Sequence, residues 1–165
     1  MAKVIHGKGI ARLRKEFESL KRAKLEVGYF DTARYPDGTP VAYIAAIHEF
    51  GYAGKNIPAR PFMRPTIAKK KQEWVKYLQG GFKRVANGQM TVNDVLAQMG
   101  GAIAGQINES IVAVTEPPLK DATVAARKRK LSDGGKGAKG SISKPLVATG
   151  VLTDLEYSLT YKVTL

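Results

Sequence analysis

The residue pair that comes nearest to catalytic chemistry in this chain is His48-Glu49, in the stretch AAIHEFGYAGKNIPARPFMRPT of residues 45–66. A zinc-protease helix begins in the same way, but it needs a second histidine one turn later so that two imidazoles share the metal while the glutamate activates water. Tyr52 stands at that position, and Gly51 is expected to end the helix. With two histidines and no cysteine, the chain has too few ligands for a zinc site. We therefore expect no metal and no cofactor.

Other catalytic motifs are missing from the sequence as well. No G-x-S-x-G turn is present to expose a serine nucleophile, and His48 has no obvious serine or acidic partner in sequence. The stretches GKGIAR and GGKGAKGS lack the spacing of a phosphate-binding loop and do not follow a predicted strand. We expect that the protein is not an enzyme, and we assign no catalytic residue.

The loop that follows, NIPARPFMRPT, is dense in proline and arginine. Pro58, Pro61 and Pro65 each fix their own backbone dihedral angle and restrict the residue before them, which predicts a stiff loop. Two arginines lie beside two apolar side chains, a mixture of bidentate donors and apolar anchors that is typical of protein interfaces. The alternative is that Phe62 and Met63 fill the core while the arginines face water.

The interface interpretation assigns a role to five residues. They are Glu49, Arg60, Phe62, Met63 and Arg64. We expect Glu49 to pair with Arg60 or Arg64, in the same chain or in a neighbouring one, because a charge-assisted hydrogen bond of this kind would fix the loop.

The chain carries a strong excess of positive charge. Its 27 lysines and arginines against 14 acids give a formal net charge of +13, which favours nucleic acid, an anionic membrane or an acidic protein as a partner. The segment 115–145 has a proline pair, few apolar residues and a Gly/Lys/Ser stretch, which predicts a long flexible loop. We expect this basic arm to contact protein or DNA through Arg127, Lys128, Arg129, Lys130, Lys136, Lys139 and Lys144. No aromatic residue interleaves these charges to stack on bases, so a DNA contact would be independent of sequence; a solvated loop is the simpler alternative.

Apolar periodicity predicts the elements that position these residues. Apolar residues recur at helical spacing in four segments: 10–20, 40–50, 67–86 and 92–111. They alternate with polar residues, as in half-buried strands, in two more: 25–29 and 157–163. We expect an α+β fold in which the strands, with a hairpin from ARYPDGTP, form a small antiparallel sheet with three to four helices packed on it. A length of 165 residues and a hydrophobic content of 44% fit one domain over residues 1–165 with the flexible basic loop at about 115–145.

Single residues mark helix ends and close contacts. Thr39 is expected to cap the second helix, with Pro40 in its first position. Thr91 and Asp94 have the spacing of a capping box before the last of the four helices. The small residues Gly101–Gly105 predict a close contact between that helix and a neighbour.

The sequence has no membrane or export signal. No run of about 18 apolar residues could span a bilayer, and the N-terminal MAKVIHGKGIARLRKEF lacks the apolar core of a secretory signal. We expect the chain to be made in the cytoplasm and to have no membrane partner.

Three motifs in a fixed order resemble the tail-completion and virion-morphogenesis proteins of tailed bacteriophages and prophages. VAYIAAIHEFG is similar to the I-x-x-I-H-E-F-G helix end of these families, NIPARPFMRPT to their I-P-A-R-P-F loop, and KPLVATGVLTDLEYSLTYKV to the K-P-L-x-x-T-G-x-L element before a terminal strand. The resemblance covers about Val41 to Val163, with matching positions at Ile47, His48, Glu49, Phe50, Gly51, Pro58, Arg60, Pro61, Phe62, Lys144, Pro145, Leu146, Thr149, Gly150 and Leu152. The chain departs from the family pattern at Ala148, where an acidic or polar residue is common, and at EYSL, where a Ser-Ile pair is common.

The resemblance implies a non-enzymatic structural protein of the virion, located at the neck or head–tail junction or at the tail end as a tail terminator. By the same resemblance it would be made in the host bacterial cytoplasm, assemble as a ring, expected to be a hexamer, and contact adjacent neck or tail proteins. DNA passing through a positive lumen would be a further, non-specific contact. The alternative function is a sequence-independent nucleic-acid-binding protein that uses the basic arm at 120–144.

Overall fold

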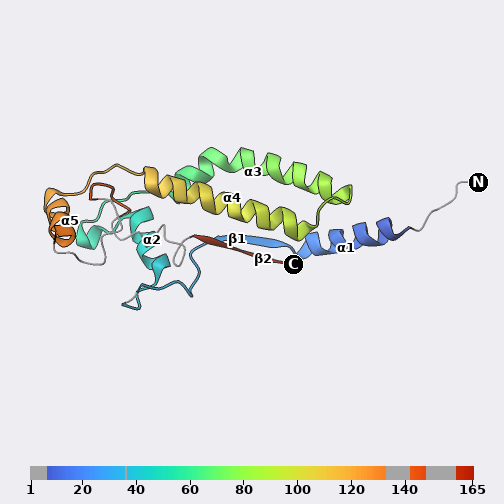
Figure 1. The fold of residues 1–165 in the computed structure, drawn as a ribbon, viewed down its shortest axis with the longest axis horizontal. Coiled ribbons are helices and arrows are strands. Elements are labelled where there is room, and N and C mark those ends of the chain that lie inside the picture. The colour runs from blue at the N-terminus through green and yellow to red at the C-terminus, as the bar shows by residue number, and fades with distance from the viewer. Residues whose placement is uncertain (1–6, 36, 133–141, 148–158) are drawn as a thin grey trace, which may run out of the picture. The chain divides into compact units, whose positions relative to one another are not determined.

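The protein's computed structural model describes residues 7–35, 37–132, 142–147 and 159–165. These residues form five α-helices, a short 3-10 helix and a two-stranded antiparallel sheet, which confirms the expected α+β class (Figure 1). In chain order the elements are α1 (Lys8–Arg22), β1 (Lys24–Gly28), α2 (Val41–Phe50), η1 (Ala53–Lys55), α3 (Met63–Ala86), α4 (Val92–Ala113), α5 (Asp121–Ser132) and β2 (Thr160–Thr164). The residues of interest outside the described part are Lys136, Lys139, Ala148, Thr149, Gly150, Leu152 and the side chain of Lys130.

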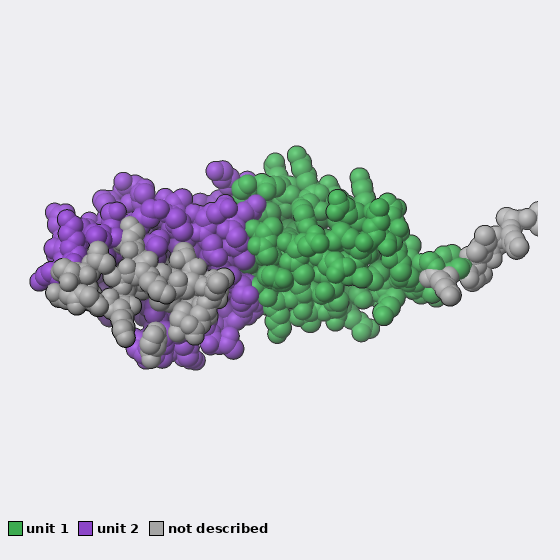
Figure 2. Space-filling view, in the orientation of Figure 1, with its two compact units in different colours: residues 1–27, 70–103, 161–165 green, residues 28–69, 104–160 purple. Residues whose placement is uncertain are grey.

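The chain divides into two compact units (Figure 2). Unit 1 comprises residues 1–27, 70–103 and 161–165, and unit 2 comprises residues 28–69 and 104–160. The helices α3 and α4 each contribute residues to both units. The single domain expected for residues 1–165 stays a prediction.

One buried cluster in the core of unit 1 consists of Val85, Val92, Val95 and Leu96. Partly buried apolar side chains from α1, β1, α3, β2 and the adjoining turns pack against it: Leu20, Ala23, Leu25, Leu78, Phe82, Met90 and Val163. Burying a Val, Leu or Phe side chain stabilises a fold by about 1.5–3 kcal/mol. The helical and alternating apolar patterns of the sequence therefore identified the elements that build this core.

The two predicted strands pair with each other, as expected, and the predicted hairpin does not join them. The described residues of the segment ARYPDGTP contribute one isolated bridge, between Arg34 and Pro40. Asp37 explains this, because its carboxylate accepts a hydrogen bond of 2.9 Å from the backbone N–H of Thr39 and so favours a turn over an extended strand.

The start of α2 differs by one position from the expected one. Pro40, not Thr39, is the N-cap residue, and no side chain caps the helix. The expected C-terminal glycine is confirmed: Gly51 has a φ of 78°, and a Cβ there would lie 2.9 Å from the backbone nitrogen of Ala59. The capping box of α4 is also confirmed, because the Thr91 N–H donates to Asp94 at 2.9 Å and the Asp94 N–H donates to Thr91 at 3.1 Å.

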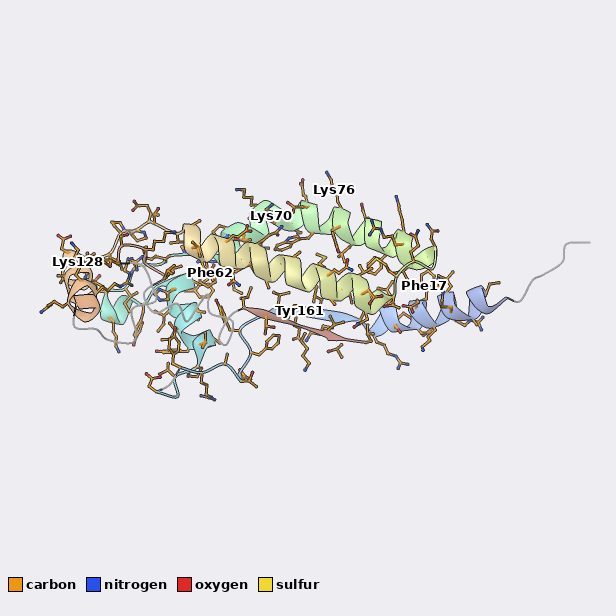
Figure 3. All side chains as sticks on the ribbon, viewed as in Figure 1. Phe17, Phe62, Lys70, Lys76, Lys128 and Tyr161 are labelled. Carbon is orange, nitrogen blue, oxygen red and sulfur yellow. The ribbon has the colours of Figure 1, made fainter. Side chains whose placement is uncertain are left out.

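The close contact expected from the glycines of α4 occurs at Gly100, one residue before the expected range, and its neighbour is a strand. A Cβ on Gly100 would lie 2.5 Å from Cγ of Tyr161 on β2, whereas a Cβ on Gly105 would meet nothing within 4 Å. Figure 3 shows Tyr161 on its strand beside α4. The expectation for Gly101–Gly105 is thus corrected: Gly100 is the residue that lets a strand approach the helix.

The segment expected to lack regular structure, 115–145, contains the helix α5. Apolar periodicity missed this helix because Val124 and Leu131 are too few to form a stripe. Its alanines, arginines and lysines are instead good helix formers. The flexibility of the basic loop remains a prediction.

Candidate functional site

The carboxylate of Glu49, at the end of α2, holds the start of α3 in unit 2. It accepts hydrogen bonds from the backbone N–H groups of Phe62 at 2.8 Å, Met63 at 2.9 Å and Arg64 at 3.0 Å. These are donors that a helix N-terminus leaves without intrahelical partners. Because a negative charge is also favoured at that end of a helix, Glu49 caps α3 from another element.

Glu49 also forms the ion pair expected from the sequence. The Nε atom of Arg64 donates to the carboxylate of Glu49 at 2.9 Å, and Nη2 of Arg64 donates to the backbone carbonyl of Glu49 at 2.7 Å. Burial alone would raise the pKa of the Glu49 carboxyl. The hydrogen bonds from the three backbone N–H groups and from Arg64 outweigh burial, so the pKa lies below its ordinary value. Glu49 is therefore an ionised structural group at neutral pH.

Arg60, the other expected partner of Glu49, binds elsewhere. Its Nε donates to the carbonyl of Pro117 at 2.7 Å and its Nη2 to the carbonyl of Pro118 at 3.0 Å. Its backbone N–H donates to the carbonyl of His48 at 2.7 Å. The side chain is buried, and burial lowers its pKa. Arg60 therefore ties the Pro/Arg loop to the end of α2 and to the proline pair.

Arg127, a member of the expected basic arm, also donates through its guanidinium to two consecutive backbone carbonyls. Its Nη1 donates to the carbonyl of Lys144 at 2.8 Å and its Nη2 to the carbonyl of Pro145 at 3.2 Å. The next residue, Leu146, is buried. This arginine fixes the K-P-L motif within unit 2, whereas Lys128 and Arg129 are exposed.

His48 lies close enough to Arg60 and Arg127 to feel the charge of both. Burial lowers the pKa of its imidazole, and the two guanidinium groups lower it further. Its Nδ1 is buried and has no hydrogen-bond partner among the described residues. His48 is therefore neutral at pH 7 and packs near Arg60 and Arg127 within unit 2. Within the described ranges no group of three His, Cys, Asp or Glu side chains could hold a metal ion.

Three of the five expected interface residues are buried within unit 2. Phe62 is fully buried and Glu49 is 4% exposed, while Arg60 is buried on the proline carbonyls. Phe62 therefore fills the core, as the alternative interpretation expected, and its direct contact with a partner stays a prediction. Met63 is half-buried, and the side chain of Arg64 is 58% exposed, so these two remain able to reach a partner.

An exposed apolar surface lies next to Met63 and Arg64, and the sequence reasoning missed it. Its members are the exposed side chains Phe50 and Ile67. The guanidinium carbon of Arg64 sits 4.7 Å from the ring centre of Phe50, within the range of a cation–π contact. A signal was available in VAYIAAIHEF, because a helix that is apolar on more than one face needs more than one apolar neighbour.

This surface includes a groove of about 360 Å³. Its lining residues come from α2, from the start of α3 and from the position directly after β1: Tyr29, Ala42, Ala45, Ala46, Glu49, Phe50, Met63, Arg64 and Ile67. The floor is apolar, and Arg64 supplies a charged edge held in place by Glu49. A mixture of aromatic anchors with an ordered arginine is the composition of binding hot spots in protein interfaces.

Comparisons with known proteins give one partial match. The chain is 44% identical over 41 residues to an uncharacterized protein of Methanocaldococcus jannaschii, and this match covers 25% of the chain and 30% of that protein. No family model matches the chain. No solved structure matches it either.

None of the described helices is long and apolar enough to cross a membrane.

Proposed function

We propose that the chain is a non-enzymatic structural protein of a tailed-phage virion that assembles as a ring at the head–tail junction or tail end. The observation that carries the proposal is the exposed groove of unit 2, where Phe50, Ile67 and Arg64 border a loop anchored by buried charged groups. A stiff loop beside an apolar surface reduces the conformational entropy lost on association. This combination suits a permanent contact between subunits.

The first two motifs and residues 144–147, the described start of the third, lie in unit 2, which supports the same proposal. The helix end holds the Pro/Arg loop through Glu49, and Arg60 of the loop holds the proline pair. Arg127 holds the backbone of the K-P-L motif. The first two motifs are thus joined by hydrogen bonds, and the described start of the third is held by an arginine of the same unit.

A ring requires two different faces on each subunit, one of which receives the other. The groove would be one face in this proposal. Phe50 is its most exposed aromatic side chain, at 67%. Burying such a side chain in a neighbouring subunit would supply about 1.5–3 kcal/mol per contact.

Light scattering of the purified protein at low and high salt tests the proposal. We expect a discrete oligomer that persists at high salt, because apolar contacts are not screened. Phe50→Ser should dissociate it, while Val75→Ser, which removes an exposed apolar side chain from unit 1, should leave it intact. A wild-type monomer at all protein concentrations would contradict ring assembly.

The alternative, DNA binding through the basic arm, is less favoured by the geometry. Arg127 uses its guanidinium on backbone carbonyls of the same unit, so it presents less of its charge to a phosphate.

A further inference from the structure

The acidic side chains in the described part of unit 1 are all engaged within that unit. Glu16 accepts a hydrogen bond of 2.8 Å from the backbone N–H of Val92, and Asp94 accepts one of 2.9 Å from Thr91. The others form ion pairs of 2.7 Å with lysines of the same element: Glu18 with Lys21, Glu26 with Lys24 and Glu73 with Lys70. None of them is therefore left to neutralise the remaining cations of the unit.

Three of the remaining cations lie on one face of α3. Lys76, Lys83 and Arg84 are exposed, and no ion pair involves them in the part of the chain that the structure describes. Residues seven and eight positions apart share a helix face, so the three form the α3 cationic face. At a rise of 1.5 Å per residue this face extends over about 12 Å. Figure 3 shows Lys76 pointing away from the ribbon of α3.

A groove of about 180 Å³ opens on this face. It is lined by Lys76, Tyr77, Gly80, Gly81, Arg84 and Met90. The hydroxyl of Tyr77 donates to Gln98 at 2.9 Å, which fixes the tyrosine as one wall. The two cations among these lining residues are Lys76 and Arg84, and no acidic residue lines the groove.

Gly80 stands between the two cations in the same helical row, four residues from each. A Cβ on Gly80 would meet nothing within 4 Å, so packing does not require a glycine there. Gly81 is different, because a Cβ on it would lie 2.5 Å from Cγ1 of Val95. Glycine weakens a helix relative to alanine, so Gly80 lowers the stability of α3 without improving its packing. What it leaves is open helix surface in the row between Lys76 and Arg84, which a side chain would otherwise cover.

We propose that the α3 cationic face binds the phosphate backbone of nucleic acid. Arg84 can hold two oxygens of one phosphate through its planar guanidinium, and Lys76 and Lys83 act as point charges on neighbouring phosphates. Contacts to phosphates carry no sequence information, so we expect this binding to be independent of sequence. The inference does not rest on the proposed virion role, because it needs only the charges and the groove of unit 1.

The test is fluorescence anisotropy with a mixed-sequence duplex of about 30 base pairs, titrated between about 50 and 200 mM salt. The variant combines Lys76→Gln, Lys83→Gln and Arg84→Gln. Each phosphate contact contributes about 0.9 to the slope of log K against log salt, so the slope should become shallower by about 2.7. Affinity at about 100 mM salt should fall by about a hundredfold.

The matched control combines Arg14→Gln, Lys15→Gln and Arg22→Gln, which removes the same charge from exposed positions of α1 in the same unit. It should keep most of the wild-type affinity. Circular dichroism should show both variants folded, since all six side chains are exposed. Equal losses in the two variants would overturn the proposal, because they would indicate diffuse attraction. Failure of the wild type to bind, or polyglutamate competing as tightly as DNA, would overturn it as well.

Discussion

The carboxylate of Glu49 serves two elements at once, because it belongs to α2 and caps α3. Three backbone N–H groups and one guanidinium converge on its two oxygens. Sequence reasoning predicted a pair of Glu49 with Arg60 or Arg64, and the structure shows the pair with Arg64. That reasoning could not predict the cap, because capping from a separate helix leaves no local pattern such as a capping box.

Replacing Glu49 by Gln should destabilise the protein by about 3 kcal/mol, because a buried hydrogen-bonded charge is removed while its donors stay buried. The new amide NH₂ would also face N–H donors instead of accepting from them. Chemical denaturation that follows helix content measures this loss. Glu18→Gln is the control: it removes an exposed partner of Lys21 and should change the free energy of unfolding by less than about 1 kcal/mol. Equal effects of the two substitutions would show that the cap contributes no more than a surface ion pair.

The stability of the protein should depend on pH through His48. Burial and the charges of Arg60 and Arg127 lower the pKa of this imidazole in the folded state below the ordinary value of 6.5. The unfolded chain therefore binds a proton near pH 6.5, while the folded chain resists it. The stabilising contribution of neutral His48 is complete above that pH and declines as the pH falls below it.

His48→Gln removes the titration but keeps a polar side chain. Between about pH 7 and pH 5 the free energy of unfolding should fall less in this variant than in the wild type. Glu49 contributes little to the difference in that window, because its lowered pKa makes stability decline only below the ordinary carboxyl value of 4.5. Parallel pH profiles of the two proteins would exclude His48 as the titrating group.

At the scale of elements, the sequence predicted most of the fold where apolar periodicity reports burial. Four helices and both strands were found because their apolar residues face a core, as Val85, Val92 and Val95 do in unit 1. The helix α5 was missed because it has no apolar stripe. The early start of α3, at Met63 in place of Ile67, was missed because Glu49 of another element supplies its cap.

The candidate site was predicted less well than the fold, for a related reason. Proline and arginine in one loop suggest both stiffness and an interface, and composition does not reveal which side chains point inward. Phe62 and Arg60 are buried in the structure, whereas Phe50, which received no role, is exposed. Only the three-dimensional arrangement separates the side chains that hold the loop from those that face a partner.

The adjacent glycines of α3 offer a matched test of packing within one element. Gly80→Ala should stabilise the protein by about 1 kcal/mol, because its Cβ meets no atom and alanine favours the helix. Gly81→Ala should destabilise it, because its Cβ would lie 2.5 Å from Cγ1 of the fully buried Val95, and the cost of overpacking is about 1–3 kcal/mol. Thermal unfolding of the two variants measures both effects. Shifts of the same sign would contradict the packing described for this part of α3.

At the scale of the whole molecule, net charge opposes the compact state. The formal charge of +13 places many like charges on a chain of 165 residues, and their mutual repulsion lowers stability at low salt. The ion pairs between exposed residues, such as Lys21 with Glu18, contribute little against this, because each is screened by water. Repulsion should therefore outweigh attraction in the response of the protein to salt.

Raising the salt concentration from about 20 to about 300 mM should increase Tm by about 2–4 °C, because a shorter Debye length screens the repulsion between surface charges. The variant that replaces Lys76, Lys83 and Arg84 by glutamine loses three positive charges, so it should begin with a higher Tm and gain less from salt. Differential scanning calorimetry of the two proteins across the salt series measures both slopes. A wild-type Tm that falls with salt would mean that attractive pairs dominate the surface, and the α3 cationic face would then have less unneutralised charge to offer a phosphate backbone.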